Sequence, residues 1–292
     1  MIMVGNRPDS KLYVEAKGRA CAEVGIRCVN QFYPATTTLD EILGQVNAFN
    51  ADPSIDGILI QMPLPSALDE KTIVDAVLPS KDVDGLHPFN VGELGMRWRN
   101  PLFTACTPAG IVELLDAEQI TLRGKIAVVL GRSDLVGNPV GMLLRKRDAT
   151  VISCHSKTNN IASLVAQADV LVSACGVPHF VRGEWLKPGC VVIDVGINFI
   201  GEKMVGDVCF DEAMGIASAI TPVPGGVGPM TIAMLLNNVY TSFAHTRRQD
   251  IRPKGHVRIL FPSFFVPEDG GAMQGMLWAV SKLISFSTAL NS

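Results

Sequence analysis

The sequence of 292 residues lacks an excess of basic charge, because 25 Lys and Arg stand against 28 Asp and Glu for a net charge of −3. Proteins that bind phosphate backbones without sequence preference normally carry a clear basic excess, and binding to an anionic membrane surface needs a cluster of cations. The short run Arg247-Arg248 is too small to supply one. We therefore expect neither nucleic acid nor a membrane surface as a partner.

The sequence also lacks paired cysteines, a targeting segment and a membrane span. Its seven cysteines are odd in number and form no CxxC pair, which is typical of buried thiols in a reducing compartment. The start, from Met1 to Asp9, has no basic or apolar targeting region. The longest apolar stretch, 273–290, is interrupted by Lys282. We expect a cytoplasmic chain, with organellar targeting as the open alternative.

What the sequence does contain is 48% apolar residues against 18% charged ones, enough for one large or two medium-sized domains. Short runs rich in Val and Ile alternate with segments of helical period, the pattern of β-α-β units around a parallel sheet. A helix follows Pro8 and ends at Gly25, and a second begins with a capping box of Thr38 and Glu41. In this half we expect strands at residues 2–4, 26–32 and 56–61.

The stretch 78–108 is rich in Pro and Asp and predicts an unusually long loop, of the kind that often carries function. From residue 126 the alternation of strand and helix resumes. Four buried strands predict a second parallel sheet, of the dinucleotide-binding type. They are expected at 126–130, 150–153, 170–174 and 191–195.

The first strand of this second sheet runs into a glycine-lined turn from Gly131 to Gly137. We expect Asn138 to cap the following helix and Pro139 to be its first residue. Backbone N–H groups at such a turn bind a pyrophosphate. The spacing is not GxGxxG, so the turn taken alone leaves a purely structural role open.

The end of the next strand favours NADP over NAD. NAD-binding versions of this fold usually place Asp or Glu there to bind the ribose 2′-hydroxyl. This sequence has Ser156 and Lys157 instead, and Arg132 lies in the preceding turn. A hydroxyl and two cations suit a 2′-phosphate.

At later strand ends, small residues around Gly176 and before Ile197 let the backbone approach a nicotinamide or ribose closely.

A second group of candidate residues lies in the first half of the chain. Tyr13 and Lys17 are four residues apart and share one helix face. Gln61 follows a strand at the end where open α/β sheets bind ligands. Asp84 lies in the long loop, where the alternative role is to stabilise a turn. Finally, residues 221–231 contain three Gly and three Pro before a helix, which predicts a rigid loop that contacts a ligand.

Eight motifs follow one another along the chain: Tyr13-Val-Glu-Ala-Lys17, Ile60-Gln-Met-Pro-Leu64, Lys81-Asp-Val-Asp-Gly-Leu86, Cys106-Thr-Pro108, Gly131-Arg-Ser-x-x-Val-Gly137-x-Pro139, Cys154-His-Ser-Lys-Thr158, Val205-Gly-Asp-Val208 and Pro224-Gly-Gly-Val-Gly-Pro-Met-Thr231. Together they resemble the bifunctional methylenetetrahydrofolate dehydrogenase/cyclohydrolases. The resemblance extends from residue 2 to about residue 246.

This resemblance implies an α/β fold of two domains with a cleft between them. Residues 1–108, completed by 221–249, would form a folate-binding catalytic domain, and 109–220 a Rossmann-type NADP domain. It also implies NADP-dependent oxidation of 5,10-methylenetetrahydrofolate to 5,10-methenyltetrahydrofolate, followed by hydrolysis to 10-formyltetrahydrofolate in the same cleft. Family members form homodimers, so a homodimer is expected. No metal is implied, and the five histidines show no ligand spacing.

The resemblance also implies roles for single residues. Lys17 would be the general acid/base of hydrolysis, and a hydrogen bond from Gln61 would favour its neutral amine. Tyr13 would cover the folate ring, and Asp84 would accept hydrogen bonds from the pterin edge. Gly225, Gly226 and Gly228 would let the backbone close over the site. Gly131, Arg132, Ser133, Gly137, Ser156, Gly176 and Ile197 would hold NADP, with Arg132 and Ser156 at the 2′-phosphate.

The sequence departs from the family at both ends. Family members carry about thirty to forty residues before the position of Ile2, and the resemblance stops near Arg248. The apolar segment 250–292 is expected to pack on the surface that the missing residues would cover.

Two alternatives to a bifunctional enzyme stay open: an inactive truncated paralogue or isoform that acts as a dimerisation or regulatory partner, and a dehydrogenase with little cyclohydrolase activity. The presence of all four catalytic candidates favours activity.

Overall fold

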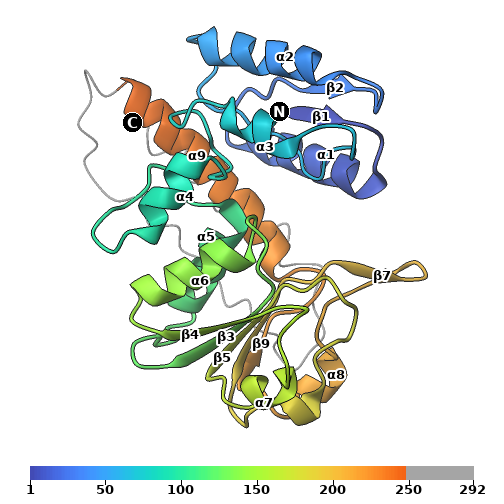
Figure 1. The fold of residues 1–292 in the computed structure, drawn as a ribbon, viewed down its shortest axis with the longest axis vertical. Coiled ribbons are helices and arrows are strands. Elements are labelled where there is room, and N and C mark those ends of the chain that lie inside the picture. Colours follow the sequence, from blue (N-terminus) through green and yellow to red (C-terminus); the bar gives the residue numbers. More distant parts are fainter. Residues whose placement is uncertain (248–292) are drawn as a thin grey trace. The chain divides into compact units, whose positions relative to one another are not determined.

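The computed structural model describes residues 1–247, which divide into two units (Figure 1). The first unit contains Met1–Cys106 and residues 232–247, and the second contains Thr107–Thr231. Residues 221–231, predicted to complete the folate domain, group with the second unit. The predicted extension 250–292, with its proposed packing, lies outside the described residues.

The first unit is a small parallel sheet surrounded by helices. β1 (Ile2–Val4) pairs with β2 (Gln31–Tyr33), and α1 (Pro8–Glu23) connects them. The unit also contains α2 (Leu39–Ala51), α3 (Glu70–Asp75), α4 (Pro88–Gly95) and most of α9 (Val227–Arg247). Apolar side chains from the two strands, from α2 and α3, and from the extended segment 58–60 form its core. The alternation of strands and helices predicted for the first half of the chain is therefore confirmed.

Two predicted strands of this unit are shorter than expected. β2 begins only at Gln31, because β1 offers just three residues for it to pair with. Residues 56–61 form isolated bridges instead of a continuous strand. They still lie beside β1, since the N–H of Ile2 donates to Leu59 O over 2.9 Å and that of Gln61 to Ile2 O over 2.8 Å. This pairing places Gln61 at the carboxyl end of the segment.

The helix ends in the first unit follow from local sequence. The capping box at the start of α2 is confirmed, because Thr38 and Glu41 each accept from the other's backbone N–H. At the other end of α2, Lys81 Nζ donates to the carbonyl oxygens of Phe49, Asn50 and Asp52 over 2.9, 2.9 and 2.7 Å. The lysine thus satisfies carbonyls that the helix itself leaves without partners.

The long loop predicted at 78–108 is interrupted by a helix. α4 begins at Pro88, with His87 Nδ1 accepting from the N–H of Phe89 over 3.0 Å. Pro at the first helical position and a capping side chain before it are ordinary start signals, so this helix was readable from the sequence. α5 (Cys106–Ala117) then begins two residues before the predicted end of the loop. The stretch is mostly loop, as predicted, but the prediction missed α4 and the start of α5.

The second unit contains the predicted parallel sheet, in the order β4-β3-β5-β6-β9. Its strands are β3 (Ile126–Leu130), β4 (Thr150–Cys154), β5 (Val170–Ser173), β6 (Val191–Asp194) and β9 (Ala219–Ile220). All neighbouring strands run parallel. β3, β5 and β6 are almost wholly buried, as expected for strands covered on both faces.

Helices and one hairpin surround this sheet. α6 (Gly137–Lys146) packs on β3 and β4. α7 (Ile161–Val165), the 3-10 turn η1 (Gly183–Trp185) and α8 (Phe210–Ala213) lie between later strands of the chain, and β7 (Asn198–Ile200) and β8 (Lys203–Val205) form an antiparallel hairpin. The sequence prediction did not include α8, the hairpin or β9, which are all short.

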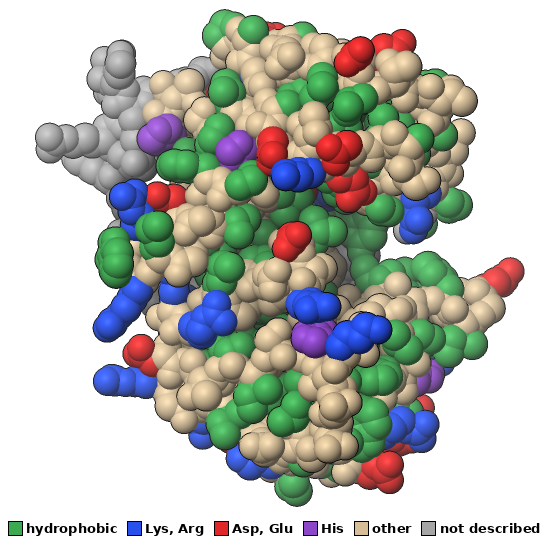
Figure 2. Space-filling model, viewed as in Figure 1, with side chains coloured by type: hydrophobic (Ala, Val, Ile, Leu, Met, Phe, Trp, Pro, Cys, Tyr) green, Lys and Arg blue, Asp and Glu red, His purple; other side chains and the backbone are tan. Residues whose placement is uncertain are grey.

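The described residues contain no helix that is both long enough and apolar enough to cross a membrane. Both signs of charge occur on the face drawn in Figure 2, together with hydrophobic and uncharged side chains.

Candidate active site

Lys17 and Gln61 are in direct contact in the first unit. Lys17 lies on α1, is only 7% exposed, and donates a hydrogen bond from Nζ to Gln61 Oε1 over 3.0 Å. Gln61 Nε2 donates to Met62 O over 2.8 Å. Because the Met62 carbonyl needs a donor, the amide of Gln61 must present its oxygen to the lysine. The expected hydrogen bond from Gln61 to Lys17 is therefore wrong in direction: Lys17 is the donor.

Asp84 belongs to the same cluster. The positive charge of Lys17 and a hydrogen bond from the Cys106 thiol both act on its carboxylate, but burial outweighs them and raises the pKa of Asp84. The backbone beside it is held by Asn238 of α9, whose Nδ2 donates to Val83 O over 2.9 Å. The structure thus brings together a lysine, an amide and a carboxylate that are far apart in the sequence.

The loop that carries Asp84 is shaped by the other carboxylate of its motif. Asp82 accepts hydrogen bonds from the N–H groups of Leu86 and His87 and from Asn90 Nδ2, over 3.2, 2.9 and 2.8 Å. Burial raises the pKa of Asp82 to about 6. The sequence suggested that Asp side chains stabilise a turn here, and the structure assigns that task to Asp82.

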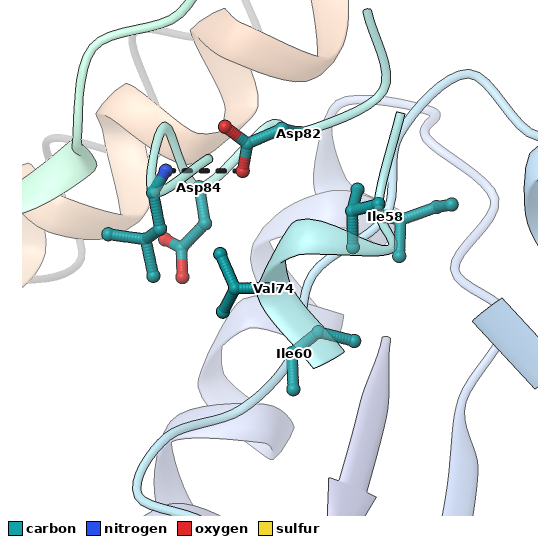
Figure 3. A pocket seen from close by; sticks show the side chains of 7 residues that line it. Ile58, Ile60, Val74, Asp82 and Asp84 are labelled. Atoms are coloured by element: carbon teal, nitrogen blue, oxygen red, sulfur yellow. Dashed lines mark hydrogen bonds between the residues drawn. The ribbon is translucent and has the colours of Figure 1, made fainter. Parts of the chain in front are cut away.

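Asp82 and Asp84 both line a small pocket whose other walls are apolar (Figure 3). Ile58 and Ile60 come from the extended segment beside β1, and Val74 comes from α3. The Asp84 carboxylate points toward the Val74 side chain, and the dashed line marks the hydrogen bond of Asp82 with the Leu86 N–H. The two carboxylates are therefore the polar groups on the wall of a small and otherwise apolar pocket.

Tyr13 lies one helical turn before Lys17 on α1 and is half-buried. Its spacing from Lys17 places both side chains on one face of the helix, as predicted. All four catalytic candidates therefore belong to the first unit, where Lys17 hydrogen-bonds to Gln61 and its charge acts on Asp84.

In the second unit, the parallel register brings the predicted cofactor residues to one edge of the sheet. Leu130 pairs with Cys154 and with Ser173, and Ser173 pairs with Asp194. The residues that follow these positions therefore leave the sheet side by side. They include Arg132, Ser133, Ser156, Gly176 and Ile197, all of which are exposed.

The turn after β3 is tight enough to require glycine. Gly131 has φ +116°, and a side chain on Gly137 would overlap the backbone of Gly131. Ser133 Oγ accepts from the N–H groups of Val136 and Gly137 over 3.2 and 3.4 Å. α6 begins at Gly137, so the predicted start at Pro139 is wrong by two residues. The hydroxyl of Ser133 and the compact turn satisfy the first N–H groups in place of Asn138.

Two buried carboxylates that were not predicted as site residues hold this edge together. Asp207 accepts from the N–H groups of Cys175 and Gly176 over 2.7 and 3.1 Å, and from Asn198 Nδ2 over 2.8 Å. Asp194 accepts from the N–H groups of Gly196, Asp207 and Val208, each over 2.9 Å. Burial raises the pKa of Asp194 to about 6. The Val205-Gly-Asp-Val208 motif was a usable signal for Asp207.

The glycine-rich loop 221–231 is compact. Gly225 has φ +106°, and a side chain on Gly226 would overlap Pro222 O, to which the Gly226 N–H donates over 3.0 Å. Gly228 lies in the first turn of α9. These contacts make the loop compact, and its contact with a ligand stays a prediction. The described residues contain no group of three or more His, Cys, Asp or Glu side chains arranged for a metal ion.

Two family models match the chain. The tetrahydrofolate dehydrogenase/cyclohydrolase catalytic domain matches residues 1–84, and the NAD(P)-binding domain of the same family matches residues 105–247. The chain belongs to the tetrahydrofolate dehydrogenase/cyclohydrolase family. These matches confirm the predicted family, and they support the predicted enzyme of NADP-linked folate one-carbon metabolism.

Curated relatives of this family are similar over most of the chain. The bifunctional protein FolD 2 of Geobacter metallireducens is 52% identical over 238 residues, which is 81% of this chain and 83% of that protein. The chloroplastic FolD 4 of Arabidopsis thaliana is 52% identical over 249 residues, 83% of this chain and 69% of that protein. The cytoplasmic C-1-tetrahydrofolate synthase of Schizosaccharomyces pombe is 48% identical, and the chain spans 30% of its length.

Solved structures of the family share the fold. The FolD enzyme of Campylobacter jejuni has a TM-score of 0.81 at 44% identity, covering 84% of this chain and 87% of that one. The FolD enzyme of Trypanosoma brucei, solved with NADP and an inhibitor, has a TM-score of 0.83 at 43% identity, covering 85% of this chain and 86% of that one. The predicted two-domain α/β fold is confirmed.

Proposed function

We propose that this chain oxidises 5,10-methylenetetrahydrofolate with NADP and then hydrolyses the 5,10-methenyl product to 10-formyltetrahydrofolate. The observation that carries the proposal is the contact of Lys17 with Gln61 beside Asp84. A buried amine with a fixed acceptor, next to a carboxylate in an apolar pocket, suits proton transfer on a cationic heterocycle. The family match supports the same chemistry.

In the hydrolytic step, water adds to the methenyl carbon and one ring nitrogen must leave, so a proton has to move from the water to that nitrogen. We assign this transfer to Lys17 Nζ. Gln61 accepts one N–H of the lysine and holds the nitrogen in place, which leaves its remaining positions for water and substrate. Orientation of this kind contributes to the rate because the reacting groups are already in position.

Asp84 and Tyr13 would bind the folate. The Asp84 carboxylate, close enough to Lys17 to feel its charge, would accept hydrogen bonds from the amino-pyrimidine edge of the pterin. Tyr13, half-buried on the Lys17 face of α1, would cover the ring. Gly225, Gly226 and Gly228 would let the backbone of loop 221–231 approach the reacting groups closely.

The sheet edge of the second unit fits NADP. Gly131 and Gly137 allow the close backbone packing of the turn before α6, and the N-terminus of that helix favours a phosphate. Gly131, Ser133 and Gly137 would hold the pyrophosphate, Arg132 and Ser156 the 2′-phosphate, and Gly176 and Ile197 the nicotinamide ribose. When bound, the nicotinamide accepts the hydride, while the residues around it orient the ring and exclude water.

The proposal is tested with the purified chain, 5,10-methylenetetrahydrofolate and NADP, by following the absorbance of the methenyl product and its decay to 10-formyltetrahydrofolate. We expect both phases, with NADP preferred over NAD. A folded chain without turnover would support the inactive-partner alternative, and a first phase without a second would support a dehydrogenase with little cyclohydrolase activity.

Assembly and location are further proposals. We propose a homodimer, as the family resemblance implies, which light scattering of the purified chain tests. The relatives include cytoplasmic, mitochondrial and chloroplastic proteins, and a cytoplasmic location stays a prediction.

A further inference from the structure

Cys21 and Cys28 lie together in a small apolar cluster of the first unit. Cys21, which is 4% exposed, is buried with Ala20 and with Leu236 of α9. Cys28 is half-buried and packs against this group. One thiol is therefore enclosed and the other can be reached from solvent.

The end of α1 explains why two cysteines seven residues apart meet. The N–H of Ile26 donates to Cys21 O over 2.8 Å, and the N–H of Gly25 donates to Ala22 O over 3.2 Å. Gly25 has φ +76°. This is a Schellman motif, in which a left-handed glycine reverses the chain after the last helical turn. Because the chain reverses here, the residues after Gly25 run back past the end of α1, and Cys28 packs against the cluster that contains Cys21.

The two thiols interact, and the interaction makes them unequal. A hydrogen bond from Cys21 favours the thiolate of Cys28 and lowers the pKa of Cys28 to about 6, whereas the same bond, together with burial, raises the pKa of Cys21. As a thiol, Cys28 donates to Asn30 Oδ1 over 3.2 Å. Rotation of the exposed Asn30 amide by half a turn would offer its NH2 group to the thiolate.

The thiols of the second unit differ from this pair. Burial raises the pKa of Cys154, and it raises those of Cys175 and Cys190 to about 11 and about 12. These groups stay protonated near neutral pH and are poor nucleophiles. A reachable thiolate beside a buried partner thiol is instead the arrangement found at reversible redox sites.

We propose that Cys21 and Cys28 form a reversible redox site that takes a low-molecular-weight disulfide as its oxidant. The Cys28 thiolate attacks one sulfur of that disulfide, a mixed disulfide forms, and one thiolate leaves. Cys21 then gives up its proton and attacks the Cys28 sulfur, which releases the second thiolate. In total, the protein loses two electrons and two protons and gains one S–S bond, while the small disulfide is reduced to two thiols.

The position of this site on α1 relates it to the candidate active site. Lys17 precedes Cys21 by four residues, so the two side chains share a helix face, and the charge of Lys17 acts on the Cys21 thiol. The redox proposal itself does not depend on the enzymatic function, because it rests on the thiol pair alone.

The full chain, equilibrated with mixtures of reduced and oxidised glutathione and then alkylated and digested with trypsin, tests the proposal. We expect the peptide 20–27 to become linked to the peptide 28–71, and the link to disappear with dithiothreitol. Glutathione retained on Cys28 of the wild-type chain without such a link would contradict the proposal, as would a link from Cys28 to any other cysteine.

Three variants separate the two thiols. Cys21→Ser should leave glutathione on Cys28, because the resolving thiol is gone, and Cys28→Ser should leave Cys21 unmodified. Cys190→Ser, in the second unit, is the matched control and should keep the link. In the wild type, the rate of Cys28 alkylation should have its midpoint near pH 6, and a further variant, Cys21→Ala, which leaves no donor at position 21, should move this midpoint up toward that of an ordinary cysteine. An unchanged midpoint would show that Cys21 does not activate Cys28.

Discussion

Lys17 Nζ donates a hydrogen bond to Gln61 Oε1 over 3.0 Å, while Gln61 Nε2 donates to Met62 O over 2.8 Å. Both polar atoms of the Gln61 amide are in use, so it cannot rotate without losing one of these bonds. The buried lysine therefore faces a fixed acceptor. The position of the Gln61 acceptor is set by the extended segment before it, which hydrogen-bonds to Ile2 of β1.

Replacing Gln61 with Leu should slow hydrolysis strongly while destabilising the chain only a little. The variant removes the acceptor of Lys17 and frees the lysine to move, so we expect the rate of methenyl hydrolysis to fall about 100-fold, the scale of a misplaced acid/base group. Stopped-flow absorbance with preformed 5,10-methenyltetrahydrofolate measures this rate. Gln167→Leu, on the exposed surface of the second unit, is the control and should leave the rate unchanged.

Lys81→Met should destabilise the chain, because three carbonyl groups at and beyond the end of α2 lose their donor. We expect a loss of about 1–3 kcal/mol in the free energy of unfolding. Urea denaturation followed by circular dichroism measures it. Lys71→Met, which changes an exposed lysine on α3, should have a much smaller effect. Equal stabilities of the two variants would show that the Lys81 contacts contribute little.

Gly206→Ala should destabilise the second unit, because a side chain at this position would overlap the buried Asp194 carboxylate. Overpacking of this kind costs about 1–3 kcal/mol, and here it also disturbs the hydrogen bonds that Asp194 accepts. Gly215→Ala is a matched control, since no atom lies within 4 Å of the added carbon. Thermal unfolding should show a clear drop for the first variant and almost none for the second.

Asp82 should make the chain less stable as pH rises from about 4 to about 6. Burial raises its folded pKa from 3.8 to about 6, so in this window the folded state holds a proton that the unfolded state has lost. Stability falls wherever the folded state binds more protons. Relative to Asp82→Asn, the wild type should lose up to about 3 kcal/mol over this window and nothing further above it.

Asp69 is the control, because its contribution to stability should change with pH in the opposite direction to that of Asp82. Its pKa is lowered, chiefly by a hydrogen bond from Thr72, so its contribution is present above the unfolded pKa and is lost as pH falls. Urea denaturation at a series of pH values compares the two Asn variants with the wild type. A pH-independent difference between the wild type and Asp82→Asn would contradict the raised pKa.

Much of the second unit could be predicted from the sequence, because its strands are continuous apolar runs in a parallel sheet. β3 has its predicted bounds, and β4, β5 and β6 are within one residue of theirs. The hairpin β7-β8 was not predicted, since three-residue strands with an exposed Phe199 and Ile200 lack the signal of burial. Short strands are stabilised by pairing rather than by their own composition.

For the candidate site, the sequence predicts the spacing of side chains along a helix, but not the contacts that they make. The spacing of Tyr13 and Lys17 on one helix face follows from the helical period alone. The direction of the bond between Lys17 and Gln61 depends on the Met62 carbonyl, and the support of the Asp84 loop by Asn238 joins residues 155 positions apart. Such long-range hydrogen bonds are set by the tertiary fold, so no local pattern could have revealed them.

The central claim is that Lys17 moves the proton in hydrolysis, and Lys17→Met tests it most directly. The variant keeps an apolar side chain of similar length but has no group that can bind or release a proton. Hydrolysis of preformed 5,10-methenyltetrahydrofolate and NADP reduction with 5,10-methylenetetrahydrofolate are measured on the same preparation. We expect hydrolysis to fall at least 100-fold, with NADP reduction affected far less. Hydrolysis at the wild-type rate by the folded variant would contradict the account.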